Sequence, residues 1–396
     1  MFLAETDEQL ALRKELREYF AELLPPEVRR QLGHAGEGAA NFRDLVRTMG
    51  RDGWLGIGWP KEYGGQGRGV LDQFVFFDEV QRAGAPFPFV TINTVGPTLM
   101  TYGSDEHKRD YLPGILNGDI NFAIGYTEPE AGTDLASLRT KAVRDGEEWV
   151  INGNKVFTSG ANQADFIWLA CRTDPEAKKH KGISMIIVPT SSPGFKTTPI
   201  VTVGSVVTQA TYYDDVRVPV SNVVGDVNGG WRLITNQLNH ERVGLAALAG
   251  LTFRLYDDVE TWCRETPAAG GAAPDDRMID VPWVQQLLAS AHAQLEALRL
   301  LNWRMASAVA EGTLTPTDAS SVKVFGVETQ IKVYRILLEI LGAAGYVRAE
   351  QPGALLKGEV ERAARAAQIN TFGGGVVEVL REIVATVGLG MTRSAR

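Results

Sequence analysis

The 396-residue sequence predicts a mostly α-helical fold that is interrupted by an all-β insert. Hydrophobic residues recur with helical spacing through residues 1–120, short β-like runs separated by turns fill residues 121–228, and helical spacing returns through residues 229–396. A chain of this length is expected to form two or three packed units rather than one core. We therefore predict an N-terminal helical domain, a middle β domain and a C-terminal helical bundle with these boundaries.

The N-terminal segment is expected to be helical with breaks. Leu12, Leu16 and Phe20 follow the spacing of one helix face, and Pro25-Pro26 ends that pattern because proline cannot continue a helix. A glycine- and proline-rich stretch, residues 53–69, separates the second helix from the third. The four expected helices cover residues 5–24, 42–50, 71–82 and 94–103.

The middle segment contains short runs of β-forming residues. Arg144-Asp145-Gly146 and Asn152-Gly153 are typical turn sequences between such runs. An all-β insert of about 100 residues is consistent with a small barrel or sandwich. The expected strands cover residues 122–126, 149–151, 166–171, 183–188 and 208–213.

The C-terminal segment is expected to form four or five helices. Residues 231–264 predict one long helix, which the polar, glycine-rich loop 266–277 follows. The run Thr315-Pro316-Thr317-Asp318 supplies a cap, a first-turn proline and an acid at the start of a helix that extends to residue 341. The remaining helices are expected over residues 284–310, 356–371 and 376–387.

Composition narrows the class of protein. The net charge of −8 argues against nucleic acid and anionic membrane surfaces as partners, because both require clustered Lys and Arg. Cys171 and Cys263 cannot make a disulfide framework or a zinc site, and the five histidines show no metal-ligand spacing. Residues 1–9 carry no signal-peptide pattern, and no run of about 18 apolar residues occurs. We expect a cytoplasmic protein without a membrane span or a metal site.

An acidic residue interrupts an apolar stripe on the expected long helix. The stripe consists of Ile234, Leu238, Leu245 and Leu248. Glu241 lies in its middle, and a carboxylate on a buried face is costly unless it is paired or its raised pKa serves a reaction. Arg242 is the nearest candidate for an ion pair, but adjacent helical residues do not face each other. From the residues alone, a structural ion pair and a catalytic base both remain open.

Two further segments suit a flat polar ligand. Residues 126–134 (YTEPEAGTD) gather hydroxyls, glycine and backbone donors directly after an expected strand, although a hydrogen-bonded turn would have the same composition. Residues 155–161 place Phe157 two positions before Ser159, and such residues share one face of a strand. An ordinary half-buried strand is the alternative there. The glycine-rich stretch 64–69 lacks the Gly-Lys-Ser/Thr ending of a phosphate loop and follows no strand, so it is expected to be a turn.

Together these segments resemble the acyl-CoA dehydrogenase family over nearly the whole chain. Residues 59–65 (WPKEYGG) are similar to the family's W-P-x-E-Y-G-G loop, and residues 126–134 match its T-E-P-x-A-G-S/T-D signature. The resemblance implies an acyl-CoA dehydrogenase-like order of helical domain, β domain and four-helix bundle. It also implies FAD as the cofactor, with Phe157 standing where the family usually has Trp. The residues implied at the isoalloxazine are Tyr126, Thr127, Phe157, Thr158 and Ser159, and Thr133 would touch the ligand near the CoA arm.

The same resemblance assigns the base. One branch of the family takes it from a Glu near the C-terminus, where this chain has Gly373; another takes it from a Glu that precedes an Arg on the long helix. The second arrangement is present as Glu241-Arg242, which implies that Glu241 abstracts the α-proton of an acyl-CoA thioester and that Arg242 lies in the substrate site. The implied reaction is α,β-dehydrogenation, and the family's usual electron acceptor is an electron-transfer flavoprotein.

Two departures from the family concern the segments that a neighbouring subunit lends to an FAD site. The R-x-x-x-F-G segment is missing after Arg264, and the Q-x-x-G-G-x-G segment is replaced by residues 339–345 (EILGAAG). Glu339 would repel a pyrophosphate. This pattern resembles the heterotetrameric (α2β2) acyl-CoA dehydrogenases of actinobacterial steroid side-chain degradation, which pair homologous subunits. Two alternatives stay open: a non-catalytic partner subunit, and a flavin-dependent N-oxygenase on the same fold.

Overall fold

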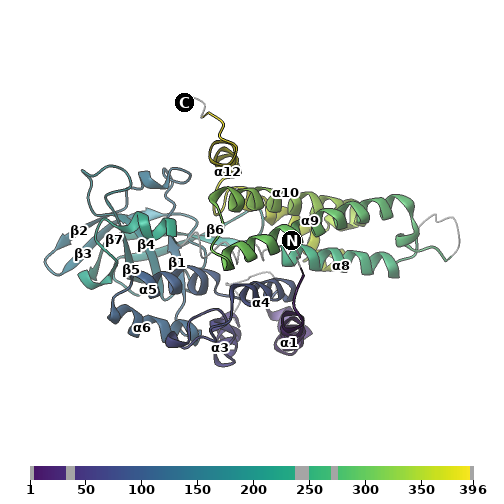
Figure 1. Cartoon of the computed structure of the whole chain (residues 1–396), viewed down its shortest axis with the longest axis horizontal. Helices are drawn as coiled ribbons and strands as arrows, with labels where there is room; N and C mark the ends of the chain where they lie inside the picture. Colours follow the sequence, from purple (N-terminus) through teal and green to yellow (C-terminus); the bar gives the residue numbers. More distant parts are fainter. Residues whose placement is uncertain (1–3, 33–40, 237–248, 269–274, 393–396) are drawn as a thin grey trace.

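The computed structural model describes residues 4–32, 41–236, 249–268 and 275–392. In Figure 1 the sheet and the C-terminal helices lie toward opposite ends of the long axis, and the N-terminal helices run along one side of both. The predicted mostly helical fold with a β insert is confirmed. No helix among these described ranges is both long and apolar enough to cross a membrane.

The N-terminal region is a set of short helices. Thr6 caps α1, where it accepts the Gln9 amide while the Gln9 side chain accepts the Thr6 amide. The four predicted helices are confirmed, but two further ones were missed because their sequences are short or largely polar. The bounds are α1 Asp7–Leu23, α2 Pro26–Leu32, α3 Phe42–Arg51, α4 Val70–Ala83, α5 Gly96–Tyr102 and α6 Asp105–Leu116, with a π-helical turn at Thr91–Val95 before α5.

The middle region is an eight-stranded β-sheet whose two halves are joined by a single residue pair, in agreement with the predicted all-β insert. One half holds β6, β7, β3 and β2, the other holds β1, β4, β5 and β8, and the pair Lys141 and Arg172 bridges β2 to β4. The strands β2, β6 and β8 were not predicted. The bounds are β1 Phe122–Gly125, β2 Lys141–Asp145, β3 Glu148–Lys155, β4 Phe166–Arg172, β5 Ile183–Pro189, β6 Phe195–Val201, β7 Val207–Pro219 and β8 Val223–Val224.

The C-terminal region is a bundle of long helices. Thr315 caps α10 and accepts the Asp318 amide at 3.1 Å, which confirms the predicted helix start. The single helix predicted over residues 231–264 is wrong, because α8 begins at Gly250 after a turn at Ala249. Any side chain at Gly250 would lie 2.7 Å from the Asp78 carbonyl oxygen, so this helix start packs directly on α4. The bounds are α8 Gly250–Glu265, α9 Pro282–Ala310, α10 Pro316–Leu341, α11 Glu359–Ala366 and α12 Val377–Ile383.

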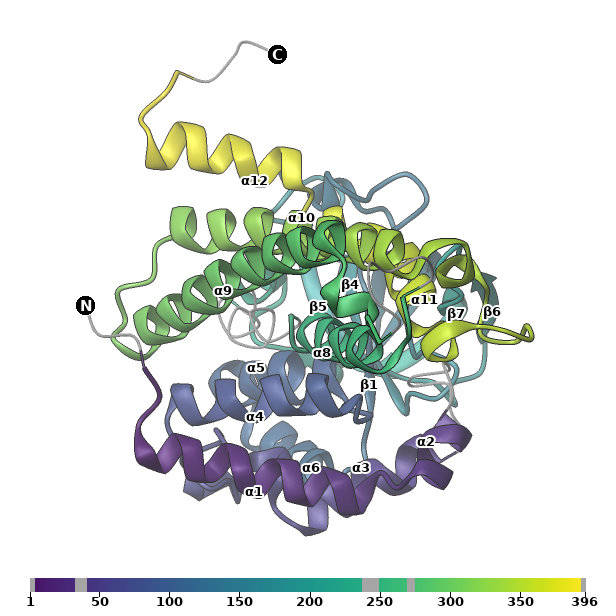
Figure 2. The same ribbon diagram turned by 90° about the vertical axis from the view of Figure 1, so that its right-hand side faces the viewer.

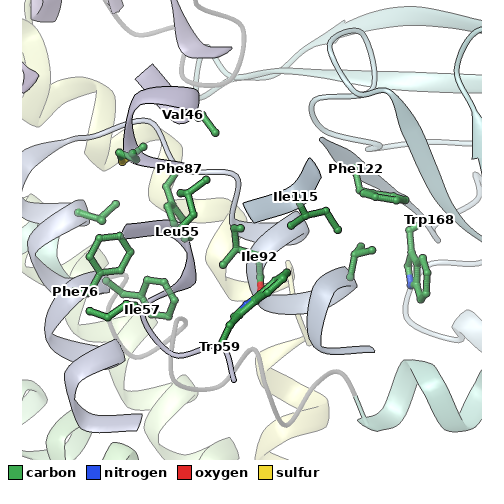
Figure 3. Close-up of a cluster of buried hydrophobic side chains, with 14 of the residues drawn as sticks. Val46, Leu55, Ile57, Trp59, Phe76, Phe87, Ile92, Ile115, Phe122 and Trp168 are labelled. Atoms are coloured by element: carbon green, nitrogen blue, oxygen red, sulfur yellow. The ribbon is translucent and has the colours of Figure 1, made fainter. Parts of the chain in front are cut away.

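Three apolar clusters hold these regions together. The largest begins in the N-terminal helices and continues onto one face of the sheet, where Phe122 and Trp168 contribute (Figure 3). Residues of β4 alternate between clusters: Trp168 joins this one, whereas Ile167 and Leu169 point into a second cluster between the two halves of the sheet. The third cluster lies within the C-terminal bundle, where α9 and α10 run side by side (Figures 1 and 2).

Candidate functional site

The nine-residue signature forms a compact loop at the end of β1. Glu128 and Ala131 exchange two backbone hydrogen bonds of 3.1 Å, which closes the loop on itself. Tyr126 and Thr127 are half-buried at its start, whereas Thr133 is exposed near its end. Strand β1 pairs in parallel with β4. The start of the loop, which directly follows β1, is therefore held against the sheet. The hydroxyl-bearing loop is therefore a fixed part of the middle region.

A buried ion pair lies beneath this loop. The Lys155 ammonium, at the end of β3, is 2.9 Å from the Glu128 carboxylate, and the two side chains are 0% and 6% exposed. Burial tends to raise the pKa of Glu128, but the Lys155 charge and the hydrogen bonds from Thr140 outweigh burial and lower that pKa. Glu128 is therefore held as a carboxylate inside the protein.

The segment after Lys155 is not the strand that we predicted. Strand β3 ends at Lys155, and Phe157 adopts a left-handed backbone conformation with φ of 59°. The prediction that Phe157 and Ser159 share a strand face is therefore wrong. Phe157 is nevertheless accessible to a ligand, because it is 58% exposed. A non-glycine residue in this conformation costs about 1 kcal/mol or more, and it persists where the surroundings enforce it. Such strain is common at ligand sites.

The two hydroxyls that follow have different surroundings. Thr158 is fully buried, and its hydroxyl lies 3.4 Å from that of Thr211 in the interior of the sheet. Ser159 is exposed and its hydroxyl lies 3.0 Å from that of Thr208. The Val156 amide donates to the Thr127 carbonyl at 2.8 Å, which brings the start of the signature loop to the end of β3. Phe157 and Ser159 follow β3 directly, so they lie beside the start of the loop.

A cationic hollow, which the sequence interpretation missed, lies beyond the other end of the signature loop. Asp134 accepts a 2.6 Å hydrogen bond from the exposed Lys179 ammonium. The hollow has a volume of about 550 Å³. It is lined by His180, Lys181, Asn228, Gly229, Trp231, Arg232 and Thr235. The run of four basic residues at positions 178–181 was the available signal, because it stands out in an acidic chain.

The predicted catalytic region is described in part. Glu241 and Arg242 lie outside the described residues, as do Leu238, Leu245 and Leu248 of the predicted stripe. Residues 230–236 are helical, and Ile234 is 4% exposed in the large core. The Asn236 amide donates to the Tyr102 hydroxyl, and the Arg232 guanidinium lies 5.3 Å from the centre of the Tyr102 ring. These contacts hold the helical residues 230–236 against Tyr102 at the end of α5.

The described residues of the segments that depart from the family pattern belong to the C-terminal region. Glu339 is exposed on the last turn of α10, and a 3₁₀ turn at Gly342–Tyr346 follows it. The loop after α8 is closed by a bridge between Pro267 and Arg277. Gly373 lies in a glycine-rich turn, where its carbonyl accepts a 2.9 Å hydrogen bond from Lys323.

Comparison with known proteins identifies the family. The family models for the acyl-CoA dehydrogenase N-terminal, middle and C-terminal domains match residues 6–119, 123–216 and 228–389. Acyl-CoA dehydrogenase FadE26 of Mycobacterium tuberculosis is 53% identical to this chain over 405 residues, and acyl-CoA dehydrogenase FadE29 of the same organism is 48% identical over 397 residues. Both alignments cover 100% of each protein.

Solved structures agree with these relatives. A chain of the Tcur3481-Tcur3483 steroid ACAD is 62% identical and matches with a TM-score of 0.94, covering 100% of both chains. A chain of the ChsE4-ChsE5 complex from Mycobacterium tuberculosis is 52% identical and matches with a TM-score of 0.92, again over 100% of both chains. The chain therefore belongs to the acyl-CoA dehydrogenase family of flavin-dependent oxidoreductases.

Proposed function

We propose that this chain is the base-bearing subunit of a heteromeric acyl-CoA dehydrogenase that uses FAD to introduce an α,β double bond into a bulky, steroid-type acyl-CoA. One observation carries the proposal. The signature loop joins a surface of hydroxyls and an exposed aromatic ring, at Thr127 and Phe157, to a cationic hollow beyond Asp134. An acyl-CoA fits this arrangement when its thioester meets a flavin held at the first end and its phosphates reach the hollow.

The donor set at the first end fits a flavin ring. Thr127 and Ser159 supply hydroxyls that can bond ring heteroatoms, and Phe157 offers an exposed aromatic face. Tyr126 would border the ring from the start of the loop. Thr158 is buried beneath Ser159, so it would support the ring-facing turn from within rather than through its hydroxyl. We assign Tyr126, Thr127, Phe157, Thr158 and Ser159 to the FAD site on these grounds.

The donor set at the second end suits the phosphates of CoA. Lys181 and Arg232 are exposed at the hollow, and charge-assisted hydrogen bonds to phosphate are strong. His180 packs near Trp231 with ring centroids 5.6 Å apart, and these rings would offer an aromatic surface to a nucleoside base. Thr133 lies between the two ends and would contact the CoA arm. Arg242 would assist substrate binding near the reacting carbons.

The proposed chemistry divides between the chain and its cofactor. Glu241 would take the α-proton of the thioester, while the thioester carbonyl carries the developing enolate charge. The chemistry that FAD supplies in such a site is acceptance of the β-hydrogen with its electron pair. The products are the α,β-unsaturated thioester and reduced flavin, which an electron-transfer flavoprotein would reoxidise. An apolar environment around Glu241 would raise its pKa toward neutrality and match it to this role.

Three observations support a heteromer in which copies of this chain are paired with copies of a related subunit. Glu339 places an acid where a pyrophosphate would bind, so this chain is a poor donor to a neighbour's FAD site. Several large apolar side chains are exposed on the β6–β7 hairpin and just after α11, and Arg365 of α11 donates to Ser205 of the hairpin. They are Val201, Val203, Val206, Val207, Ile369 and Phe372. The similar solved structures bear paired names, Tcur3481-Tcur3483 and ChsE4-ChsE5, and the first is called a steroid ACAD.

The test is anaerobic reduction of the flavin by substrate. The chain is co-expressed with a related acyl-CoA dehydrogenase subunit, and the complex is mixed with a polycyclic, steroid side-chain acyl-CoA or with a short straight-chain acyl-CoA. We expect the oxidised-flavin absorbance to be bleached by the bulky substrate and much more slowly by the short one. A complex that binds FAD but is not reduced by any acyl-CoA would favour a non-catalytic subunit or an N-oxygenase.

A further inference from the structure

The Lys155–Glu128 pair is unusual for its depth. The Lys155 side chain is 0% exposed, so its ammonium is removed from water. Removing two charges from water is expensive, and a buried ion pair is often no more stabilising than an apolar pair of the same shape. Stability therefore does not explain why a charged pair is placed here, and its hydrogen bonds indicate another role.

The hydrogen bonds of the pair fasten the signature loop. Besides Glu128, the Lys155 ammonium donates to the Tyr126 carbonyl at 2.9 Å. The two Glu128 carboxylate oxygens accept the backbone amides of Arg139 and Thr140 at 2.7 and 2.8 Å. The pair thus ties the start of the loop to the end of β3 and to the segment that leads into β2.

The next peptide is fastened at the same place. The Val156 amide donates to the Thr127 carbonyl at 2.8 Å, so the consecutive carbonyls of Tyr126 and Thr127 both bond to the end of β3. The Thr158 amide donates to the Gln209 carbonyl at 2.9 Å, and the strained Phe157 lies between these two anchored positions. The end of β3 therefore fixes the positions of two segments, the peptide that contains Thr127 and the turn that contains Phe157.

We propose that Lys155 and Glu128 form a positioning clamp that sets the flavin-facing peptide Tyr126–Thr127 relative to Phe157. The inference rests on the proposed FAD site. Neither residue touches the flavin in this assignment; they act through the backbone that they hold. A small shift of a positioned group can reduce catalysis strongly without loss of the fold.

The decisive variant removes both charges at once. Lys155→Met with Glu128→Gln keeps the approximate side-chain volumes and leaves no unpaired buried charge. We expect the co-purified complex to stay folded with a lowered thermal midpoint, because the Gln side chain can accept from one of the two backbone amides and the Tyr126 carbonyl loses its donor. We also expect a shifted flavin absorbance band, FAD retention weakened by about tenfold, and kcat lowered by about tenfold or more with a smaller change in KM. A double variant with wild-type spectrum, retention and kcat would overturn the clamp.

A matched control lies on the same loop. Glu130 pairs with Arg139 at 2.5 Å on the surface, where the two side chains are 68% and 77% exposed. Glu130→Gln should leave the flavin spectrum, retention and kcat unchanged; an equal effect there would show that any change in the loop suffices and would overturn the clamp.

A milder variant covers the case in which the double variant does not fold. Glu128→Asp keeps the charge but shortens its reach, so we expect the same spectral shift at smaller amplitude, and wild-type behaviour would contradict the proposal. A wild-type complex without FAD would overturn the proposed function and the clamp together. A flavin-loaded wild type with unaffected variants would overturn the clamp alone.

Discussion

The signature loop and the end of α10 would both serve FAD in a homo-oligomer of this family, but they differ in how this chain builds them. The loop is fastened by the buried Lys155–Glu128 pair and by backbone hydrogen bonds to β3. The end of α10 instead exposes Glu339 before a short 3₁₀ turn. Under the proposed function, we infer from this contrast that the chain keeps its own half of a flavin site and lacks the half that it would lend to a neighbour.

The contrast extends to the two positions from which the family draws a base. Gly373 leaves the C-terminal position without a carboxylate, and its turn is bonded to Lys323. The other position, Glu241, follows the helical residues 230–236, which α5 holds through Tyr102. In the proposed assignment, the base Glu241 and the flavin loop belong to the same half of the site. This agreement favours a catalytic role for this chain in a complex.

The largest expected effect comes from removal of the base. Glu241→Gln should leave FAD binding intact and lower the rate of flavin reduction by about 10²–10⁴-fold or more, because the amide cannot accept the α-proton. Stopped-flow absorbance of the co-purified complex measures this rate. Activity above about a tenth of wild type would place the base elsewhere.

The cationic hollow should affect substrate binding rather than chemistry. His180→Ala combined with Lys181→Ala should raise KM for acyl-CoA by about tenfold with little change in kcat, because charge-assisted hydrogen bonds to phosphate are lost. The increase should diminish at high ionic strength. Lys196→Ala on β6, also an exposed cation of the middle region, is the matched control and should leave KM unchanged.

Loss of single hydroxyls at the flavin surface should have a smaller effect. Thr127→Ala and Ser159→Ala should each weaken FAD binding by about two- to tenfold, the value of one hydrogen bond. Titration of apoprotein with FAD measures the change, and the absorbance maximum reports the altered environment. If both variants retain the affinity and spectrum of wild type, the flavin does not lie on this surface.

The last effect is confined to acid pH and sharpens the contrast between the two regions. The pKa of Glu128 is lowered from its ordinary value of 4.5 in the folded protein, so its carboxylate stabilises the fold above that value. As pH falls below 4.5 through the lowered pKa, this contribution is lost, and the stability gap between wild type and Glu128→Gln should narrow. Glu339→Gln should differ from wild type by less than about 0.5 kcal/mol throughout. Thermal unfolding from neutral to acid pH measures both gaps.

Much of the architecture follows from local patterns in the sequence. The apolar runs of β4 and β5, the capping residues of α10 and the signature at residues 126–134 are contiguous, so their physical consequences can be inferred without a structure. Short polar elements such as α6 were missed because periodicity is weak there. The helix predicted through residues 231–264 was wrong because α8 begins at Gly250, where a side chain would lie too close to α4.

The features that position the site depend on contacts between distant residues. Lys155 and Glu128 are 27 positions apart, and nothing in either segment alone indicates that they form a buried pair. Strand alternation predicted a shared face for Phe157 and Ser159, but β3 ends at Lys155 and Phe157 takes a left-handed conformation. The basic run at residues 178–181 was visible in the sequence, but its neighbours at residues 228–235 come from another part of the chain.

Flavin counting tests the central claim, that this chain holds one half of a shared site, most directly. The chain is purified alone and after co-expression with a related acyl-CoA dehydrogenase subunit, and each sample is measured by native mass spectrometry and flavin absorbance. The chain alone should lose its cofactor, and the complex should hold about two FAD per four chains because only the sites with this chain's flavin loop and the partner's segments are complete. A homotetramer of this chain that retains about one FAD per subunit and is fully active would contradict the account.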